Sequence, residues 1–250
     1  MINNNPILFF DSGIGGLTTL FECAKILPNE HYLYYADENN LPYGNKNIKT
    51  LRKLLFVTLS KLVLEFKPKI VVIACNTATA IVILKMRTAF PEVVFIGAEP
   101  AIIPAIKQKK RILLLCTKNT LKTSRVIKLC KKYYNFSSFC PEYLASLVER
   151  NFDNNEILKE EVNNLFGRFV ENVDCVVLGC THYVFLKSQI RQLFGKGAII
   201  LDGNEGIAKR VEYCLTSFDI FGVNGGIKFL NKGPTYTRLV CAYLKLLGGA

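Results

Sequence analysis

The sequence lacks the features that mark membrane, secreted and zinc-binding proteins. Its longest charge-free apolar stretch, residues 70–84, is shorter than the roughly 20 residues that a membrane helix needs. No basic residue precedes Lys25, and nine cysteines are an odd number, so neither a secretory signal nor a disulfide framework is expected. No Cys-x-x-Cys pair occurs and only two histidines are present, which argues against a metal site. We therefore expect a cytoplasmic protein with no metal and no membrane contact.

The composition is that of a compact globular protein. Of the 250 residues, 50% are hydrophobic and 21% are charged, which excludes an extended disordered chain or a coiled coil as the main body. The net charge of +12 permits an anionic partner. However, the basic run at 107–111 has no interleaved aromatic residues and matches no nucleic-acid motif. The sequence thus predicts no nucleic-acid partner.

Short apolar runs alternate with segments of helical periodicity along nearly the whole chain, and this alternation predicts βα units around parallel sheets. The expected strands are 7–10, 32–36, 70–74, 93–96, 112–115, 173–178 and 198–201. The expected helices are one that starts at Leu17 and ends before Pro28, and then 51–66, 120–133, 154–170, 205–216 and 235–247. The predicted fold class is therefore α/β.

An offset of 105 residues superimposes landmarks of the two halves of the chain. The matched positions are Asp11 with Cys116, Gly44 with Glu149, and Cys75 with Cys180. Residue identity between the halves is low, so the offset suggests two similarly built lobes. Roughly forty residues at the end have no counterpart and are expected to pack on the first lobe.

We accordingly predict two pseudosymmetric lobes, each a mainly parallel sheet flanked by helices. The first lobe is expected to contain residues 1–98 plus 207–250, and the second residues 99–206. Ligands of parallel sheets bind outside the carboxyl ends of the strands, so the active site is expected between the lobes.

Cys75 and Cys180 each follow an apolar strand directly, in the segments VVIACNT and VVLGCTH. Such positions lead into helix N-termini, whose free N–H groups and positive dipole end favour an anion. A free thiol titrates near pH ~8.5, so a modest shift lets one site hold a thiolate while the other stays a thiol. Two such groups on opposite sides of a small anionic ligand could perform a two-base proton exchange.

Other residues near these turns have two interpretations each. Asp11 either contacts an ammonium group or caps the following helix, and His182 is either structural or exchanges a proton with Cys180. The segment DSGIGG has the position of a dinucleotide-binding turn, but Thr18 occupies the third glycine slot. The remaining isolated cysteines that fit an inert, buried role are Cys23, Cys130, Cys175, Cys214 and Cys241.

Six short motifs occur in order along most of the chain: FDSGIGGL at 10–17, LPYG at 41–44, ACNTA at 74–78, GAEPAI at 97–102, CTKNT at 116–120 and LGCTHY at 178–183. Together they resemble the glutamate racemases of the aspartate/glutamate racemase superfamily. The pair ACNTA and GCTH, with about a hundred residues between them, is the most specific part of this resemblance.

The resemblance implies a cofactor-free isomerase that interconverts L- and D-glutamate and supplies D-glutamate for peptidoglycan synthesis. Cys75 resembles the base that takes the α-proton from D-glutamate, and Cys180 the base that serves L-glutamate. Asp11 and His182 resemble groups that assist proton movement, and Glu149 resembles a further acidic member of the site. The positions that match substrate-binding residues are Asp11, Ser12, Tyr43, Gly44, Asn76, Thr77, Thr117, Thr120, Thr181 and His182. We also expect a homodimer.

Three positions depart from the family pattern. Val184 stands where proline is more usual, and Ala36 and Cys116 stand where glycine is more usual, so local turn geometry is expected to differ. Because Cys116 lies beside Thr117, near the expected site of the distal carboxylate, the preference for glutamate over aspartate stays open. The alternatives are an aspartate or related amino-acid racemase on the same scaffold, or a non-catalytic basic binding module.

Overall fold

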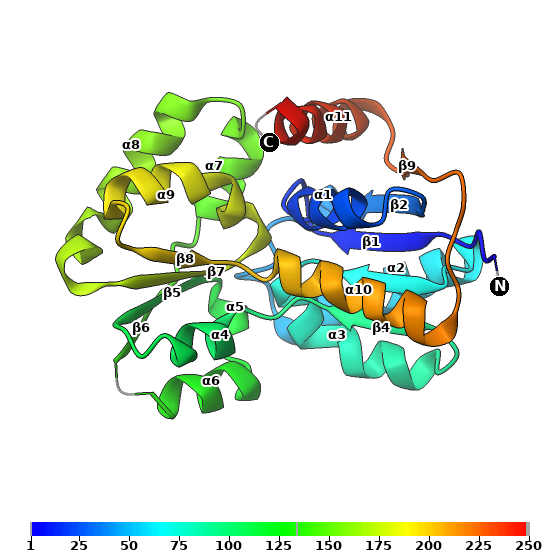
Figure 1. The fold of residues 1–250 in the computed structure, drawn as a ribbon, viewed down its shortest axis with the longest axis horizontal. Helices are drawn as coiled ribbons and strands as arrows, with labels where there is room; N and C mark the ends of the chain where they lie inside the picture. The colour runs from blue at the N-terminus through cyan, green and yellow to red at the C-terminus, as the bar shows by residue number, and fades with distance from the viewer. Residues whose placement is uncertain (1, 134, 249–250) are drawn as a thin grey trace.

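The computed structural model describes residues 2–133 and 135–248 and contains two separate β-sheets, each covered by helices on both faces. Figure 1 shows the two sheets side by side, with the first sheet mainly in blue and cyan apart from its orange-red edge strand near the C-terminus, and the second sheet in green and yellow. Every strand pairing in the described residues is parallel. The predicted α/β class, with two parallel sheets flanked by helices, is confirmed.

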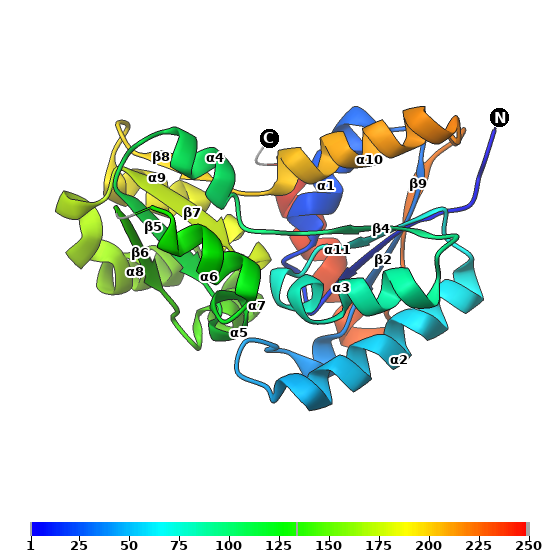
Figure 2. The same cartoon turned by 90° about the horizontal axis from the view of Figure 1, so that it is seen from below.

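The first sheet has the strand order β4-β3-β1-β2-β9. Its strands are β1 (Ile7–Asp11), β2 (His31–Ala36), β3 (Ile70–Ile73), β4 (Val94–Gly97) and β9 (Gly226–Phe229). The helices α1 (Leu17–Ile26), α10 (Asn204–Phe218) and α11 (Gly233–Gly248) cover one face, and α2 (Ile48–Phe66) and α3 (Asn76–Ala89) cover the other. Figure 2 shows α10 and α2 on opposite sides of the sheet.

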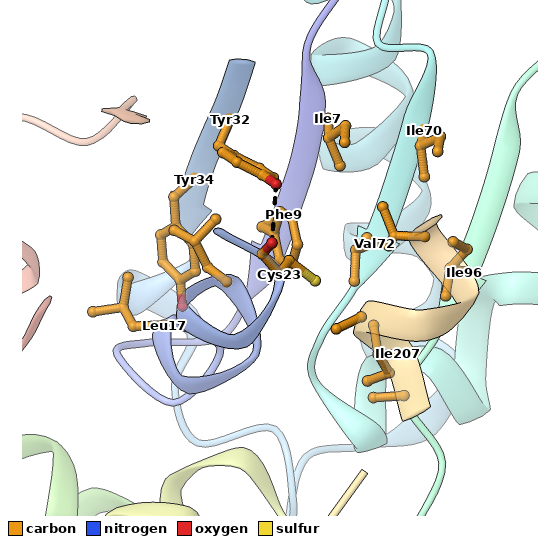
Figure 3. Close-up of a cluster of buried hydrophobic side chains, with 14 of the residues drawn as sticks. Ile7, Phe9, Leu17, Cys23, Tyr32, Tyr34, Ile70, Val72, Ile96 and Ile207 are labelled. Atoms are coloured by element: carbon orange, nitrogen blue, oxygen red, sulfur yellow. Dashed lines mark hydrogen bonds between the residues drawn. The ribbon is translucent and has the colours of Figure 1, made fainter. Parts of the chain in front are cut away.

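Alternation along β1 explains the two helix layers of the first sheet. Ile7 and Phe9 point to the face of α1 and α10, whereas Leu8 and Phe10 point to the face of α2 and α3. All four side chains are fully buried. Figure 3 shows the first of these clusters, where Tyr32 donates a hydrogen bond to the Cys23 carbonyl. Since both faces are covered, the strand reads as one continuous apolar run in the sequence.

The second sheet has the strand order β6-β5-β7-β8. Its strands are β5 (Ile112–Cys116), β6 (Phe136–Phe139), β7 (Cys175–Gly179) and β8 (Ile199–Leu201). The helices α4 (Ile102–Lys107) and α6 (Ser124–Lys131) pack on one face, and α7 (Leu144–Asn151), α8 (Asn155–Phe166) and α9 (Lys187–Phe194) pack on the other. Short helical segments are α5 (Lys118–Leu121), η1 (Glu38–Asn40), η2 (Gly167–Asn172) and η3 (Thr181–Leu186).

The offset of 105 residues found in the sequence relates the two sheets strand by strand. In each of four strand pairs, the first residues of the two strands are 105 positions apart. These first residues are Ile7 and Ile112 for β1 and β5, His31 and Phe136 for β2 and β6, Ile70 and Cys175 for β3 and β7, and Val94 and Ile199 for β4 and β8. The spatial order β4-β3-β1-β2 repeats as β8-β7-β5-β6. The similar construction of the two halves is thereby confirmed.

The C-terminal segment returns to the first sheet, as predicted. Strand β9 pairs with β2, and α10 and α11 both pack against α1. The division of the chain at 98/99 and 206/207 stays a prediction; α10 begins at Asn204, so the second boundary falls inside its first turn. Among the helices of the described residues, none combines the length and apolar character needed to cross a bilayer.

Two predicted helices were wrong, and two strands were missed. The predicted helix 120–133 is two helices, because Thr123 caps a new helix by accepting a hydrogen bond from the Val126 amide. The predicted helix 154–170 ends at Phe166 and continues as the 3-10 segment η2. Strands β6 and β9 were not predicted. Both lie at sheet edges and have no continuous apolar run: β6 exposes both of its central serines, and the side chains of β9 are alternately exposed and partly buried.

Candidate active site

A cavity lies between the two sheets, and residues from both halves line it. The first half contributes Ser12, Tyr43, Gly44, Cys75, Asn76 and Thr77, and the second half contributes Thr117, Cys180, Thr181 and His182. A ligand bound there would contact residues of both halves of the chain. The two thiols singled out in the sequence therefore line the same cavity.

Cys75 lies between β3 and α3, where its extended backbone makes it the N-cap residue of the helix. The Ser12 side chain and the Ala78 amide are polar neighbours of its sulfur. Only 7% of the residue is exposed. Burial, and next the nearby Asp11 carboxylate, raise the pKa of the Cys75 thiol above its usual value. The resting form of Cys75 is therefore the neutral thiol.

Cys180 has a different environment, at the start of η3 beyond β7. The His182 ring is hydrogen bonded to the Cys180 sulfur, and its Nε2 lies 2.7 Å from Glu149 Oε2. Burial alone would lower the pKa of His182, but the hydrogen bonds to Cys180 and Glu149 outweigh it and raise this pKa well above the usual range. The imidazole is thus a cation that can support negative charge on the Cys180 sulfur.

Glu149 reaches this position from α7 and is held by the glycine turn of the first half. Its Oε2 accepts a hydrogen bond of 2.9 Å from the Ile14 amide, across 135 residues of sequence. Glu149 is 4% exposed. A carboxylate this deeply buried requires partners, and the Ile14 amide and the His182 cation provide them.

Asp11 connects the end of β1 to the second half. Its Oδ1 accepts a hydrogen bond of 3.1 Å from the Gly13 amide, and its Oδ2 accepts one of 3.1 Å from the Thr181 hydroxyl. The Ser12 hydroxyl also donates to Oδ1, at 3.4 Å. Complete burial raises the pKa of Asp11, while the charge of His182 opposes this rise. Since Ser12 also contacts Cys75, Asp11 is connected to that thiol through one hydroxyl.

The glycine turn permits this close contact between the halves. A Cβ atom on Gly15 would lie 2.7 Å from His182 Nδ1 and 2.8 Å from the His182 backbone nitrogen, closer than real Cβ atoms approach such atoms. A Cβ atom on Gly13 would overlap the Glu149 carboxylate. The turn of the DSGIGG segment therefore packs against protein groups of the site.

Three threonine hydroxyls form a cluster that joins the N-termini of α3 and α5. The Thr77 and Thr117 hydroxyl oxygens are 2.8 Å apart, those of Thr117 and Thr120 are 2.9 Å apart, and those of Thr77 and Thr120 are 3.2 Å apart. Thr117 is also the N-cap of α5. Thr77 and Thr117 line the cavity, and Thr120 lies behind them. Hydroxyls at two helix N-termini form a site suited to a carboxylate.

The segment with Tyr43 and Gly44 is held over the cavity by buried polar contacts. The Tyr43 hydroxyl donates to Asp37 Oδ2 at 2.5 Å. Asn119 donates to the carbonyls of Tyr43 and Lys46 at 2.9 and 3.0 Å. These contacts fasten a loop of the first half to α5 of the second half.

Three predicted site residues do not line the cavity themselves. Asp11, Thr120 and Glu149 lie one hydrogen bond behind it. Their lining partners are Thr181 for Asp11, Thr117 for Thr120 and His182 for Glu149.

The family model of the Asp/Glu/Hydantoin racemases matches residues 23–211 of this chain. The chain belongs to this family. A glutamate racemase of Clostridium novyi is 35% identical and covers 99% of this chain and 98% of its own length, and glutamate racemase 2 of Bacillus subtilis is 38% identical, with 90% and 88% covered. A crystal structure of a Bacillus anthracis glutamate racemase isoform superimposes with a TM-score of 0.84 at 26% identity, covering 98% of this chain and 95% of the other. The resemblance of the sequence motifs is confirmed.

The three departures from the racemase pattern lie outside the centre of the site. Ala36 is the last residue of β2. Its amide donates a hydrogen bond to the Asn231 side chain and its carbonyl accepts one from it, as they would with the backbone of a neighbouring strand. Val184 lies inside η3 and is partly exposed. Cys116 has no exposed surface and does not line the cavity, although Thr117 beside it does.

Several residues of this racemase site escaped the sequence analysis. The segment 140–142 forms part of the cavity wall and follows strand β6, which no apolar run marks. Arg238 of α11 pairs with Glu38 and lies 3.9 Å from Glu149 Oε1. Asn119 falls within the CTKNT motif, and that motif was its available signal. Among the described residues, no three His, Cys, Asp or Glu side chains are grouped as a metal site requires.

Proposed function

We propose that this chain is a glutamate racemase that interconverts L- and D-glutamate without a cofactor, with Cys75 and Cys180 as its two bases. The observation that carries the proposal is the position of both thiols on one cavity between the two sheets. Membership of the racemase family supports it, as do two relatives named glutamate racemase at 35% and 38% identity. D-glutamate for peptidoglycan synthesis is the corresponding product.

The two thiols have different surroundings. The imidazolium of His182 lies beside Cys180, while burial raises the pKa of Cys75 and keeps it a neutral thiol. With L-glutamate bound, the Cys180 sulfur removes the α-proton, and the Cys75 thiol delivers its proton to the opposite face of the carbon. The product is D-glutamate, and the reverse reaction exchanges the two roles.

The surrounding groups return each thiol to its starting state. Ser12 connects Cys75 to the Asp11 carboxylate, and His182 connects Cys180 to Glu149. Each pair thus joins a thiol to a carboxylate through one intervening side chain. Both carboxylates are deeply buried, so a proton exchanged there meets little competition from bulk water.

The site also stabilises the charge that develops on the substrate. Removal of the α-proton places negative charge next to the α-carboxylate, and prearranged donors lower the barrier where that charge appears. Asn76 and Thr181, the residues that follow the two thiols, supply such donors at helical N-termini. The lining hydroxyls of Thr77 and Thr117, with Thr120 behind them, are the proposed binding site of the distal carboxylate. The amine is proposed to lie on the side of Asp11, whose carboxylate Thr181 separates from the cavity.

The decisive assay uses D-glutamate in D₂O with neither pyridoxal phosphate nor metal. We expect L-glutamate that carries solvent deuterium at Cα. Cys75→Ser and Cys180→Ser should each reduce racemisation by a factor on the order of 10²–10⁴ or more. Cys130→Ser is the matched control, because Cys130 lies on α6 and does not line the cavity. Full activity in either single variant of Cys75 or Cys180 would refute the two-thiol mechanism.

A substrate panel separates glutamate from its competitors. We expect L-aspartate to react much more slowly, because its shorter side chain cannot place both carboxylates and the α-carbon in the same positions. Preference for aspartate would convert the proposal to an aspartate racemase. Salt-dependent binding to a polyanion without any α-proton exchange would instead favour a basic binding module.

A cytoplasmic homodimer without nucleic-acid or membrane partners completes the proposal. Its support is the resemblance to glutamate racemases. Sedimentation equilibrium over a range of protein concentrations tests the dimer, since a constant mass of about 28 kDa would contradict it.

A further inference from the structure

Two cysteines that the proposed reaction does not use meet at the wall of the cavity. Cys116 is the last residue of β5, and Cys140 directly follows β6. The register pairs Leu115 with Phe139, so the two cysteines occupy the next adjacent positions of neighbouring parallel strands. Their sulfur atoms are 3.8 Å apart.

This geometry is compatible with a disulfide. Neighbouring strands lie about 4.8 Å apart, and the Cα atoms of disulfide-bonded cysteines are usually about 4.4–6.8 Å apart. The sulfurs need only close from 3.8 Å to about 2.05 Å, a change that side-chain rotation can supply without a new backbone arrangement.

The two sulfurs differ in access and in acidity. Cys140 is partly exposed and lines the cavity, whereas Cys116 has no exposed surface. The hydrogen bond with Cys116 lowers the pKa of Cys140, with a smaller contribution from the Lys118 ammonium group, although burial opposes both. The same hydrogen bond, together with burial, raises the pKa of Cys116. A reagent in the cavity therefore meets Cys140 first, and Cys140 has the lower pKa of the two thiols.

We propose that Cys140 and Cys116 form an oxidation site in which a hydroperoxide oxidises Cys140 and Cys116 then closes a disulfide. The Cys140 thiolate attacks one peroxide oxygen, the O–O bond breaks, and an alcohol or water leaves after taking a proton, so that Cys140 becomes a sulfenic acid. The Cys116 sulfur loses its proton and attacks the Cys140 sulfur, the S–O bond breaks, and water leaves. Two thiols lose two electrons in total, and one hydroperoxide gains them.

This site is separate from the proposed catalytic pair, since it uses neither Cys75 nor Cys180. The inference does not require the racemase activity and can be tested on the reduced protein without substrate.

The test treats the reduced full-length protein with one equivalent of hydrogen peroxide, blocks the remaining thiols with N-ethylmaleimide, and maps tryptic peptides by mass spectrometry. Cleavage after Lys and Arg places Cys116 in peptide 112–118 and Cys140 in peptide 133–150, each with no other cysteine. We expect these two peptides cross-linked, about 2 Da lighter than the sum of the reduced peptides. A wild-type protein whose peptide 133–150 is linked to Cys75, Cys130 or Cys180, or is not linked at all, would overturn the proposal.

Variants separate the two roles. In Cys116→Ser, dimedone should trap the sulfenic acid on Cys140, whereas in Cys140→Ser it should not label Cys116. Because Cys140 is only half-buried, its serine variant tests the cross-link without altering the core. Cys130→Ser, the matched control from the same half of the chain, should form the cross-link as the wild type does. Dimedone on Cys116 in the Cys140→Ser variant would show that the assigned order is wrong.

Discussion

Adding a single methyl group at Gly15 tests whether the two halves must approach as closely as the structure shows. Gly15 has an ordinary negative φ, so an alanine is not excluded by its backbone conformation. Its Cβ would lie 2.7 Å from His182 Nδ1, 2.8 Å from the His182 backbone nitrogen, and closer still to the Thr181 hydroxyl. Since ordinary contacts of this kind begin near 3.4 Å, Gly15→Ala must displace His182 and Thr181 by more than half an ångström.

The expected effect on catalysis is larger than the effect on stability. Overpacking of this kind costs about 1–3 kcal/mol of unfolding free energy. A displacement near 1 Å at the reacting groups can reduce a rate by about 10². We therefore expect Gly15→Ala to lower kcat/KM for D-glutamate by about two orders of magnitude, measured by polarimetry or circular dichroism. Urea unfolding of the same protein measures the stability term.

Gly206→Ala is the control for this experiment. Gly206 lies in the first turn of α10, and a Cβ there meets no atom within 4 Å. This variant should keep kcat/KM within about twofold of wild type and gain up to about 1 kcal/mol, because alanine reduces the entropy of the unfolded chain. If Gly15→Ala also keeps wild-type kcat/KM, close contact at the glycine turn is not what positions His182.

Two further predictions concern buried charges. The pKa of His182 is raised, so the folded protein keeps a proton that the unfolded chain releases near pH 6.5. The contribution of His182 to the unfolding free energy should therefore be highest below that pH. It should fall as pH rises through the folded pKa, by at most about 1.4 kcal/mol per pH unit. Glu149→Gln should flatten this dependence in urea unfolding series, and an unchanged slope would contradict the pairing. Lys69, whose Nζ lies 2.6 Å from Glu30 Oε2 with both side chains 2% exposed, is expected to be essential for stability. Lys69→Met should lower the unfolding free energy by about 3–5 kcal/mol, because it leaves the buried Glu30 charge unpaired. The double variant Lys69→Met/Glu30→Gln should lower it considerably less. Equal losses in the two variants would show that the unpaired Glu30 charge is not the cause.

The fold was largely predictable because most of its strands are buried on both faces. Strands β1, β3, β5 and β7 lie inside their sheets and appear as continuous apolar runs. Strand β6, with the sequence FSSF, exposes its two serines at a sheet edge, and β9 includes the exposed Lys228. Such edge strands form because neighbouring strands offer hydrogen-bond partners, which no local pattern in the sequence records.

The candidate site was predictable where chemistry and local position coincide. Cys75 and Cys180 stand in polar turns at strand ends, and their motifs identify them. The partners that tune them come from distant parts of the chain, as the bond between the Ile14 amide and Glu149 shows. Cys140 was missed for the same reason, since its strand had no signature and its contact with Cys116 arises from the sheet register.

The symmetry of the scaffold makes the asymmetry of its site informative. Strands related by the 105-residue offset place Cys75 and Cys180 at equivalent ends, yet the position equivalent to Asp11 is Cys116 and the position equivalent to Glu149 is Gly44. Two thiols in identical surroundings would share one protonation state, leaving no proton donor when both are charged and no base when both are neutral. A racemase with two bases needs one of each in the same site. The carboxylates are therefore placed where the symmetry is broken: Asp11 and burial keep Cys75 protonated, while Glu149 holds a charged His182 beside Cys180.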